Sequence, residues 1–117
     1  MALKMQRISS RKDFEKLFKR GFFVSDKALN MKCLRNGTAA TRAAFVVSTK
    51  VSKSAVVRNT IRRRLREIFR VESDHVTKGV DILFIASPIC AKVPFTELKS
   101  AVRRLLLRAR LVDIPKP

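Results

Sequence analysis

The chain has 117 residues, of which 46% are apolar, three are glycine and four are proline. It can therefore bury the core of one domain over residues 1–117, and we expect frayed ends at about 1–7 and 112–117. Twenty-seven lysines and arginines against nine acids leave a formal charge of +18, which favours a polyanionic partner, nucleic acid first of all. No run of 18 apolar residues could span a membrane, so we exclude a membrane-spanning protein and expect a cytoplasmic location.

The first predicted element is a helix that begins after Ser10. Ser10 with Asp13 three residues later resembles a capping box, in which the serine side chain caps the first turn. The next residues place three apolar side chains on one face: Phe14, Leu17 and Phe18. Gly21 is expected to end this helix.

Three segments have the pattern of strands. Apolar and polar residues alternate towards the end of 22–34, and the Asn-Gly pair in 35–37 predicts a reversal after it. Segments 42–49 and 80–86 have the β-branched and aromatic content of buried strands. Because a helix lies between them, after the polar loop 50–54, these two strands are expected to be parallel in a βαβ unit.

A basic amphipathic helix is predicted over residues 55–70. Its apolar stripe consists of Val57, Ile61, Leu65 and Ile68. A second stripe about 100° round the axis, widened by Asn59 and Arg63, consists of Arg58, Arg62, Arg66 and Arg70. Like charges at one-turn spacing repel by about 0.2–0.5 kcal/mol per pair. Since Glu67 is the only acid in this stretch, we interpret the basic stripe as a phosphate-binding face.

The last predicted helix has Thr96 as its N-cap. Its apolar stripe consists of Leu98, Val102, Leu105 and Ala109. The same helix also carries four basic residues: Arg103, Arg104, Arg108 and Arg110.

Neither a catalytic residue nor a metal site is predicted. The chain lacks the nucleotide-binding, nucleophile-elbow and zinc-helix motifs. Glu72, Asp74 and His75 form the closest group of possible metal ligands, and we interpret them as a solvated loop. Cys33 and Cys90 have no metal-binding or disulfide spacing, so both are expected to be small core residues. The pattern favours a protein that binds over one that cuts.

The segment "KVSKSAVVRNTIRRRLREIF", residues 50–69, resembles the signature of the bacterial ribonuclease P protein subunit. "DFEKLFKRG" at 13–21, "VS" at 47–48, "DILFIA" at 81–86 and a leucine-rich basic last helix follow in the order of that family. The resemblance implies one compact α/β (α+β) domain, ordered helix–strands–helix–strand–helix and similar to domain 2 of ribosomal protein S5. It also implies a left-handed βαβ crossover, against the usual right-handed preference.

This resemblance implies a subunit of ribonuclease P, the ribonucleoprotein endonuclease that removes the 5′ leader from precursor tRNA. In that family the RNA subunit performs the hydrolysis, with magnesium bound mainly by that RNA and the substrate. The protein binds the catalytic RNA and the leader. No obligate protein partner and no membrane are implied.

Two sets of residues follow. The RNA-binding set consists of Lys50, Lys53, Arg58, Asn59, Arg62, Arg63 and Arg66, with Arg70 added by the spacing of the basic stripe. The leader-binding cleft would contain Phe14, Phe18 and Lys32, although two phenylalanines four residues apart are as readily explained as core. The sequence departs from the family at Thr60, where arginine is usual, and at Lys32, where an aromatic is frequent. Its loop near Ser52–Ser54 is one residue longer.

Two classes of alternative remain open: another RNA-binding protein, and a DNA-binding or membrane-surface protein. A ribosomal protein or an RNA chaperone would share the charge without needing a leader cleft. A DNA reader would need a short turn to a second recognition helix, which we do not find at 55–70. A membrane-surface helix fits poorly with a buried apolar stripe between strands.

Overall fold

The computed structural model describes residues 6–8 and 10–111, which form a five-stranded mixed sheet flanked by helices. The strands are Gln6–Arg7 (β1), Phe22–Ser25 (β2), Leu29–Arg35 (β3), Arg42–Val46 (β4) and Val80–Ala86 (β5). The helices are Arg11–Arg20 (α1), Ala55–Glu72 (α2) and Phe95–Arg108 (α3), with short 3-10 helices at Ser73–His75 (η1) and Pro88–Lys92 (η2). The strand order in the sheet is β1-β4-β5-β3-β2.

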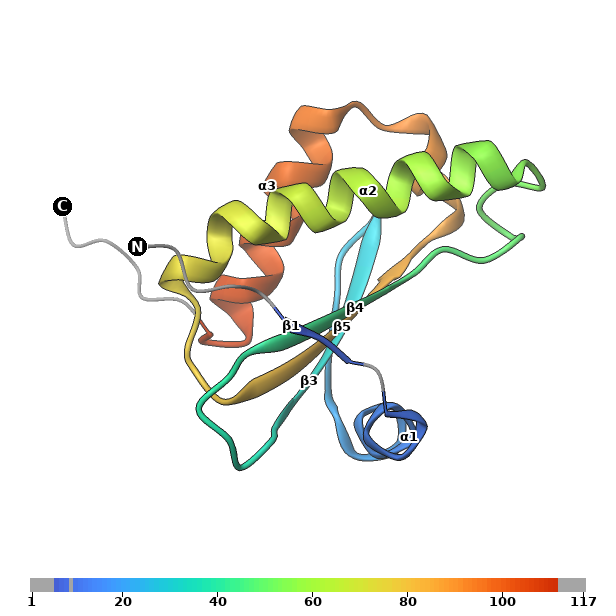
Figure 1. The fold of residues 1–117 in the computed structure, drawn as a ribbon. Coiled ribbons are helices and arrows are strands. Elements are labelled where there is room, and N and C mark those ends of the chain that lie inside the picture. Colours follow the sequence, from blue (N-terminus) through green and yellow to red (C-terminus); the bar gives the residue numbers. More distant parts are fainter. Residues whose placement is uncertain (1–5, 9, 112–117) are drawn as a thin grey trace, which may run out of the picture.

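The helices divide between the two faces of the sheet. α2 and α3 cover one face, and α1 lies against the other (Figure 1). The larger core lies under α2 and α3, where the rings of Phe69 and Phe84 meet edge to face with centroids 5.3 Å apart. A smaller core under α1 is formed by Ile8, Leu17 and Leu83. The predicted α+β domain is confirmed.

The βαβ unit also has the predicted arrangement. β4 and β5 are parallel neighbours in the sheet. The chain leaves β4, returns along α2 above the sheet and enters β5 on the side of β4 farther from the viewer (Figure 1). That path is a left-handed crossover, the exception to a preference that holds in about 98% of such units.

Different interactions determine where α1 begins and where it ends. The Ser10 hydroxyl accepts a hydrogen bond from the backbone N–H of Asp13 at 3.3 Å, which confirms the predicted cap. Gly21 follows the helix in an extended conformation rather than a left-handed one. A Cβ at this position would come within 2.4 Å of the Leu17 carbonyl oxygen, so close approach of the backbone requires the glycine.

The expectation of one strand over 22–34 is wrong, because this segment is a hairpin of the antiparallel strands β2 and β3. The backbone N–H of Asp26 donates to the Leu29 carbonyl at 2.9 Å, and the Asp26 side chain accepts from the N–H of Lys27 at 2.7 Å. An aspartate that accepts a hydrogen bond from the adjacent backbone is a turn signal, and the apolar alternation that follows it in β3 hid it.

Three further boundaries differ from prediction. β1 lies within 1–7, which was expected to fray, and it pairs in parallel with β4. The strand predicted at 42–49 ends at Val46, shortly before a turn closed by Val51 N–H and the Ser48 carbonyl at 3.0 Å. α3 begins at Phe95 after Pro94, whose carbonyl accepts the first helical bonds, so Thr96 is not the N-cap. The frayed end expected at 112–117 lies outside the described residues.

Both cysteines are buried, unpaired thiols, as predicted. Burial raises the pKa of Cys33, and it raises that of Cys90 to about 11. Glu72 does not lie in a solvated loop, since it is a buried residue of the last turn of α2. Asp74 and His75 follow it in η1.

Candidate nucleic-acid interface

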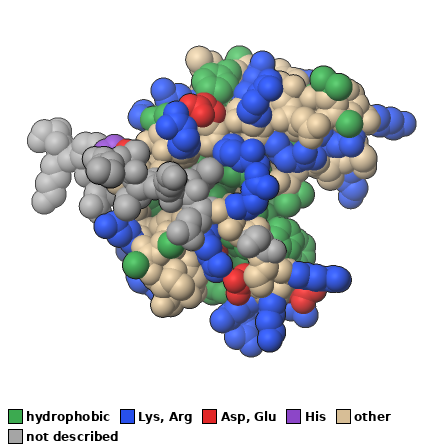
Figure 2. Space-filling view, in the orientation of Figure 1, with side chains coloured by type: hydrophobic (Ala, Val, Ile, Leu, Met, Phe, Trp, Pro, Cys, Tyr) green, Lys and Arg blue, Asp and Glu red, His purple; other side chains and the backbone are tan. Residues whose placement is uncertain are grey.

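α2 carries its apolar stripe and its basic stripe on different sides of the helix. Ile61, Leu65 and Ile68 are buried against the sheet as predicted. Val57 remains 38% exposed, because the first turn of α2 projects beyond the strands (Figure 1). The Ser54 hydroxyl caps this turn by accepting from the Val57 N–H at 3.3 Å. Figure 2 shows blue side chains gathered along the outside of the helix.

Within the described part of the chain, the arginines at the centre of the basic stripe form no ion pair. Arg62 donates to the side-chain oxygen of Asn59, which leaves its charge in place. The Arg66 guanidinium lies 5.9 Å from the centroid of the Phe45 ring. Among the described residues, Arg62, Arg63 and Arg66 form no ion pair. These three arginines are therefore available to a partner with phosphates.

The two ends of the basic stripe are occupied within the chain. Arg58 donates from Nη1 to the carbonyls of Ser52 and Lys53, both at 3.0 Å. Arg70 forms a two-pronged ion pair with Glu67 at 2.6 and 3.1 Å. Their mutual hydrogen bonds lower the pKa of Glu67 and raise that of Arg70. Arg58 therefore orders the loop before α2, and Arg70 is partly neutralised.

The loop before α2 presents its lysines outward. Lys50 and Lys53 are exposed, while Val51 between them is buried and anchors the loop. Thr60, where the family usually has arginine, donates its hydroxyl to the Val56 carbonyl at 2.9 Å. This local bond satisfies the side chain within the helix.

The predicted leader residues lie together between α1 and the sheet. Phe14 is half-buried and packs against the smaller core, whereas Phe18 is 52% exposed. The ammonium group of Lys32 lies 4.2 Å from the centroid of the Phe18 ring and donates to the Phe18 carbonyl at 2.5 Å. One face of the Phe18 ring is thus covered by a cation. Phe14 contributes to packing, and Phe18 is the ring that a ligand could reach.

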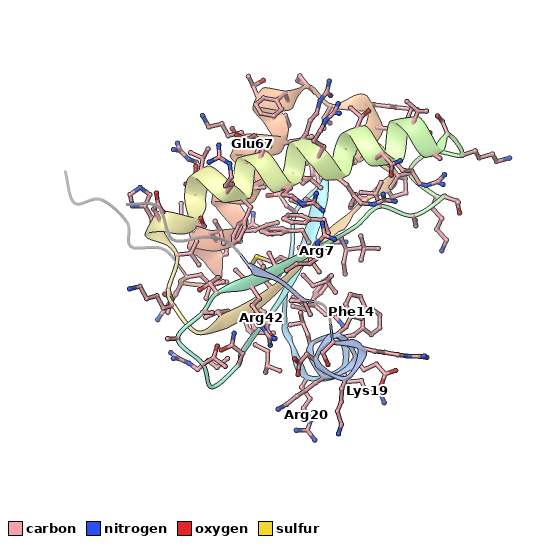
Figure 3. All side chains as sticks on the ribbon, in the orientation of Figure 1. Arg7, Phe14, Lys19, Arg20, Arg42 and Glu67 are labelled. Carbon is pink, nitrogen blue, oxygen red and sulfur yellow. The ribbon has the colours of Figure 1, made fainter. Side chains whose placement is uncertain are left out.

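Arg42 joins α1 to the sheet, a role that no sequence pattern predicted. Its guanidinium donates to both carboxylate oxygens of Asp81, at 2.8 and 2.7 Å, and to Asp13 on α1 at 3.1 Å. Asn36 also donates to Asp81, at 2.8 Å. The bonds to Asp81 and Asp13 raise the pKa of Arg42. Figure 3 labels the Arg42 side chain on the sheet. Because its partners lie 29 and 39 residues away, no local pattern could have revealed the network.

The arginines of α3 are also paired within the chain. Arg103 pairs with Glu72 at 2.8 Å. Arg104 pairs with Asp26 and with Glu97, each at 2.8 Å. Arg108 lies 3.9 Å from the Asp26 carboxylate and donates to the Ser25 carbonyl. α3 therefore offers fewer unsatisfied cations than its composition suggests.

Residues 6–8 and 10–111 contain neither a metal-binding cluster nor a membrane-spanning helix. No group of three or more histidine, cysteine or acidic side chains is placed to hold a metal ion. None of the helices is long and apolar enough to cross a membrane.

Comparison with known proteins gives the same family by three routes. The family model for ribonuclease P matches residues 3–110. This chain belongs to the ribonuclease P protein family. The ribonuclease P protein component of Alkaliphilus oremlandii is 34% identical to it over 109 residues, which cover 93% of this chain and 95% of the relative. That of Clostridium kluyveri is 36% identical and covers 90% and 95%.

Solved structures of ribonuclease P proteins share the fold. The Staphylococcus aureus protein has a TM-score of 0.84 at 27% identity, covering 94% of this chain and all of that one. The Thermotoga maritima protein has a TM-score of 0.79 at 30% identity, covering 88% and 96%. The family assigned from residues 50–69 is thus confirmed, and the individual RNA contacts remain predictions.

Proposed function

We propose that this chain, as the protein component of ribonuclease P, binds the catalytic RNA through α2 and its preceding loop. The observation that carries the proposal is the run of Arg62, Arg63 and Arg66 without acidic partners among the described residues. Binding of phosphates by such side chains releases condensed counterions, so the affinity should fall steeply with salt. Lys50, Lys53 and Asn59 extend the same surface, which Arg58 supports by ordering the loop.

The second part of the proposal concerns precursor tRNA. The exposed Phe18 ring and the neighbouring Lys32 would contact the 5′ leader between α1 and the sheet. A base can stack on the open face of the ring, while the lysine attracts the phosphate that follows. Arg42 supports this arrangement because its ion pairs hold α1 at a fixed position against β4 and β5.

We further propose that the chemistry belongs to the RNA subunit. In this division of roles, magnesium is bound mainly by the catalytic RNA and the substrate, and the protein strengthens leader binding. Support comes from membership of the family and from a surface suited to RNA. We also propose that the protein acts with its RNA in the cytoplasm.

The decisive experiment is reconstitution. Precursor tRNA would be cleaved by a bacterial ribonuclease P RNA at low magnesium, with and without this protein. We expect faster cleavage at the correct 5′ end. An equally basic unrelated protein controls for charge, and the Arg62→Glu, Arg66→Glu double variant controls for the α2 surface. If neither control differed from the wild type with several bacterial RNAs, a ribosomal or chaperone role would replace the proposal.

A further inference from the structure

A hollow outside the two predicted RNA surfaces lies at the edge of the sheet, where β1, β4 and α2 meet. Its volume is about 290 Å³, at the lower end of small-molecule sites, which are roughly 300–1,000 Å³. It is lined by Arg7, Ile8, Ala43, Ala44, Phe45 and Arg66. Figure 3 shows Arg7 rising from β1 towards α2, on the face of the sheet opposite to α1.

The charges around this hollow are all positive. Arg7 comes from the first strand and Arg66 from α2, and both side chains are exposed. No carboxylate lines the hollow, and within the described part of the chain neither arginine forms an ion pair. Two guanidinium groups that converge without an acid repel each other, so an anion between them would stabilise the arrangement.

The wall of the hollow presents the edge of an aromatic ring. Phe45 is partly exposed; its ring is stacked on Phe84, with centroids 5.6 Å apart and planes 8° from parallel, and the Arg66 guanidinium lies over the ring, 5.9 Å from its centroid. β1 pairs with β4 only at Arg42 and Ala43. The outer edge of β4 from Ala44 onward therefore has no partner strand among the described residues. Such an edge offers backbone donors and acceptors to a planar polar group.

We propose that this hollow binds one nucleotide of a single-stranded RNA segment, with its phosphate between Arg7 and Arg66 and its base against the edge of the Phe45 ring and the open edge of β4. The inference rests on the proposed function, because Arg66 continues the surface of α2, and it adds a subsite with a defined ligand. A base engaged in a duplex could not enter so small a hollow, which selects unpaired nucleotides. The nucleotide comes from the catalytic RNA or from the leader.

The binding chemistry can be tested with a small probe. Adenosine 5′-monophosphate and inorganic phosphate would be titrated into the full chain at millimolar concentration, with the arginine Nε–H signals followed by NMR. We expect the monophosphate to shift the signals of Arg7 and Arg66 at lower concentration than phosphate does. Equal responses to both probes, or responses spread over all arginines, would refute a nucleotide site.

Variants can identify which RNA supplies the bound nucleotide. Arg7→Gln should weaken binding of the RNA that supplies the nucleotide about fivefold and reduce its salt slope by about 0.7, the value for one contact to a single strand. Lys99→Gln, which removes one charge from the exposed face of α3, should change affinity less than about twofold. Separate titrations with catalytic RNA, precursor tRNA and mature tRNA assign the source.

A double-mutant cycle separates this inference from the proposed function. If Arg7 and Arg66 hold one phosphate, the Arg7→Gln, Arg66→Gln double variant loses less affinity than the product of the single losses. Additive losses would place the two arginines on separate phosphates and overturn the subsite. Should Arg7→Gln have no effect while reversal of Arg62 and Arg66 still weakens RNA binding, the subsite fails and the proposed function stands.

Discussion

α2 and α3 are both basic amphipathic helices on the same face of the sheet, yet their arginines have different surroundings. On α3, Arg103, Arg104 and Arg108 all lie within 4 Å of acids, and two of these acids, Glu72 and Asp26, come from other elements. On α2, Arg62, Arg63 and Arg66 have no acidic partner among the described residues. Arginine density alone therefore does not identify an RNA-binding helix. The acids that other parts of the chain bring to it decide the role.

The largest expected effect is on the unpaired arginines. Reversing Arg62 and Arg66 to glutamate should weaken binding of the catalytic RNA roughly 100-fold and lower the slope of log affinity against log salt by about two, one per lost contact. Neither side chain is buried, so the free energy of unfolding should stay close to that of the wild type. If the variant kept its affinity for the RNA across a salt titration, the unpaired arginines of α2 would not differ from the paired arginines of α3 in RNA binding.

Removing the acid that pairs with an arginine of α3 should lower the stability of the fold and leave RNA affinity almost unchanged. Asp26→Asn removes a buried carboxylate that holds Arg104, and we expect the free energy of unfolding to fall by about 1–2 kcal/mol, discounted because Arg104 is partly solvated. RNA affinity should change little. Urea denaturation and RNA titration of one preparation measure both. A large loss of RNA affinity in a stable variant would show that α3 also binds RNA.

The same ion pair predicts a dependence on pH. The hydrogen bond from Arg104 lowers the pKa of Asp26 below its usual value of about 3.9. A carboxyl whose pKa is lowered by folding stabilises the native state above that usual value, and the contribution is lost as the pH falls through the lowered pKa. The stability difference between wild type and Asp26→Asn should therefore shrink on acidification below about pH 4.

A smaller effect is expected where the contact is a ring rather than a charge. Phe18→Ala should reduce affinity for precursor tRNA relative to mature tRNA about fivefold, near the lower end for base stacking, because Lys32 covers one face of the ring. The protein should remain folded, since the side chain is half exposed. A variant that unfolds more easily but keeps the preference for precursor would make Phe18 a core residue.

The smallest effect converts a paired arginine of α2 into an unpaired one. Glu67→Gln releases Arg70 from its ion pair and should raise affinity for the catalytic RNA about twofold, with a slightly steeper salt dependence. Glu15→Gln, which releases Arg11 on α1, serves as the matched control. If both variants gained the same affinity for the RNA, the effect would be due to net charge.

The elements that local patterns define were predictable. α2 and β5 were predicted closely, because periodicity and β-branched content act over neighbouring residues. The βαβ arrangement of β4 and β5 followed from their order in the chain. Among the site residues, the exposed positions of Arg62, Arg63 and Arg66 followed from their angle to the apolar stripe, although their contacts with RNA stay predictions.

What escaped prediction depends on distant partners. Arg104 and Asp26 are 78 residues apart, and the strand pairing of β1 depends on β4 more than thirty residues later. Arg58 was assigned to RNA alone, but its bonds to two loop carbonyls arise only when the loop folds back on α2. Periodicity within one segment cannot predict such long-range contacts, because they form only when the sheet is assembled.

The position of β5 has a consequence for how the protein is made. β5 is the neighbour of both β3 and β4, although it follows them in the chain by more than thirty residues. Until it leaves the ribosome, the β2–β3 hairpin and the β1–β4 pair have no common strand and the main core cannot close. Folding therefore waits until β5 has been synthesised, and a nascent chain stalled before residue 80 would present its cations on an unfolded polypeptide.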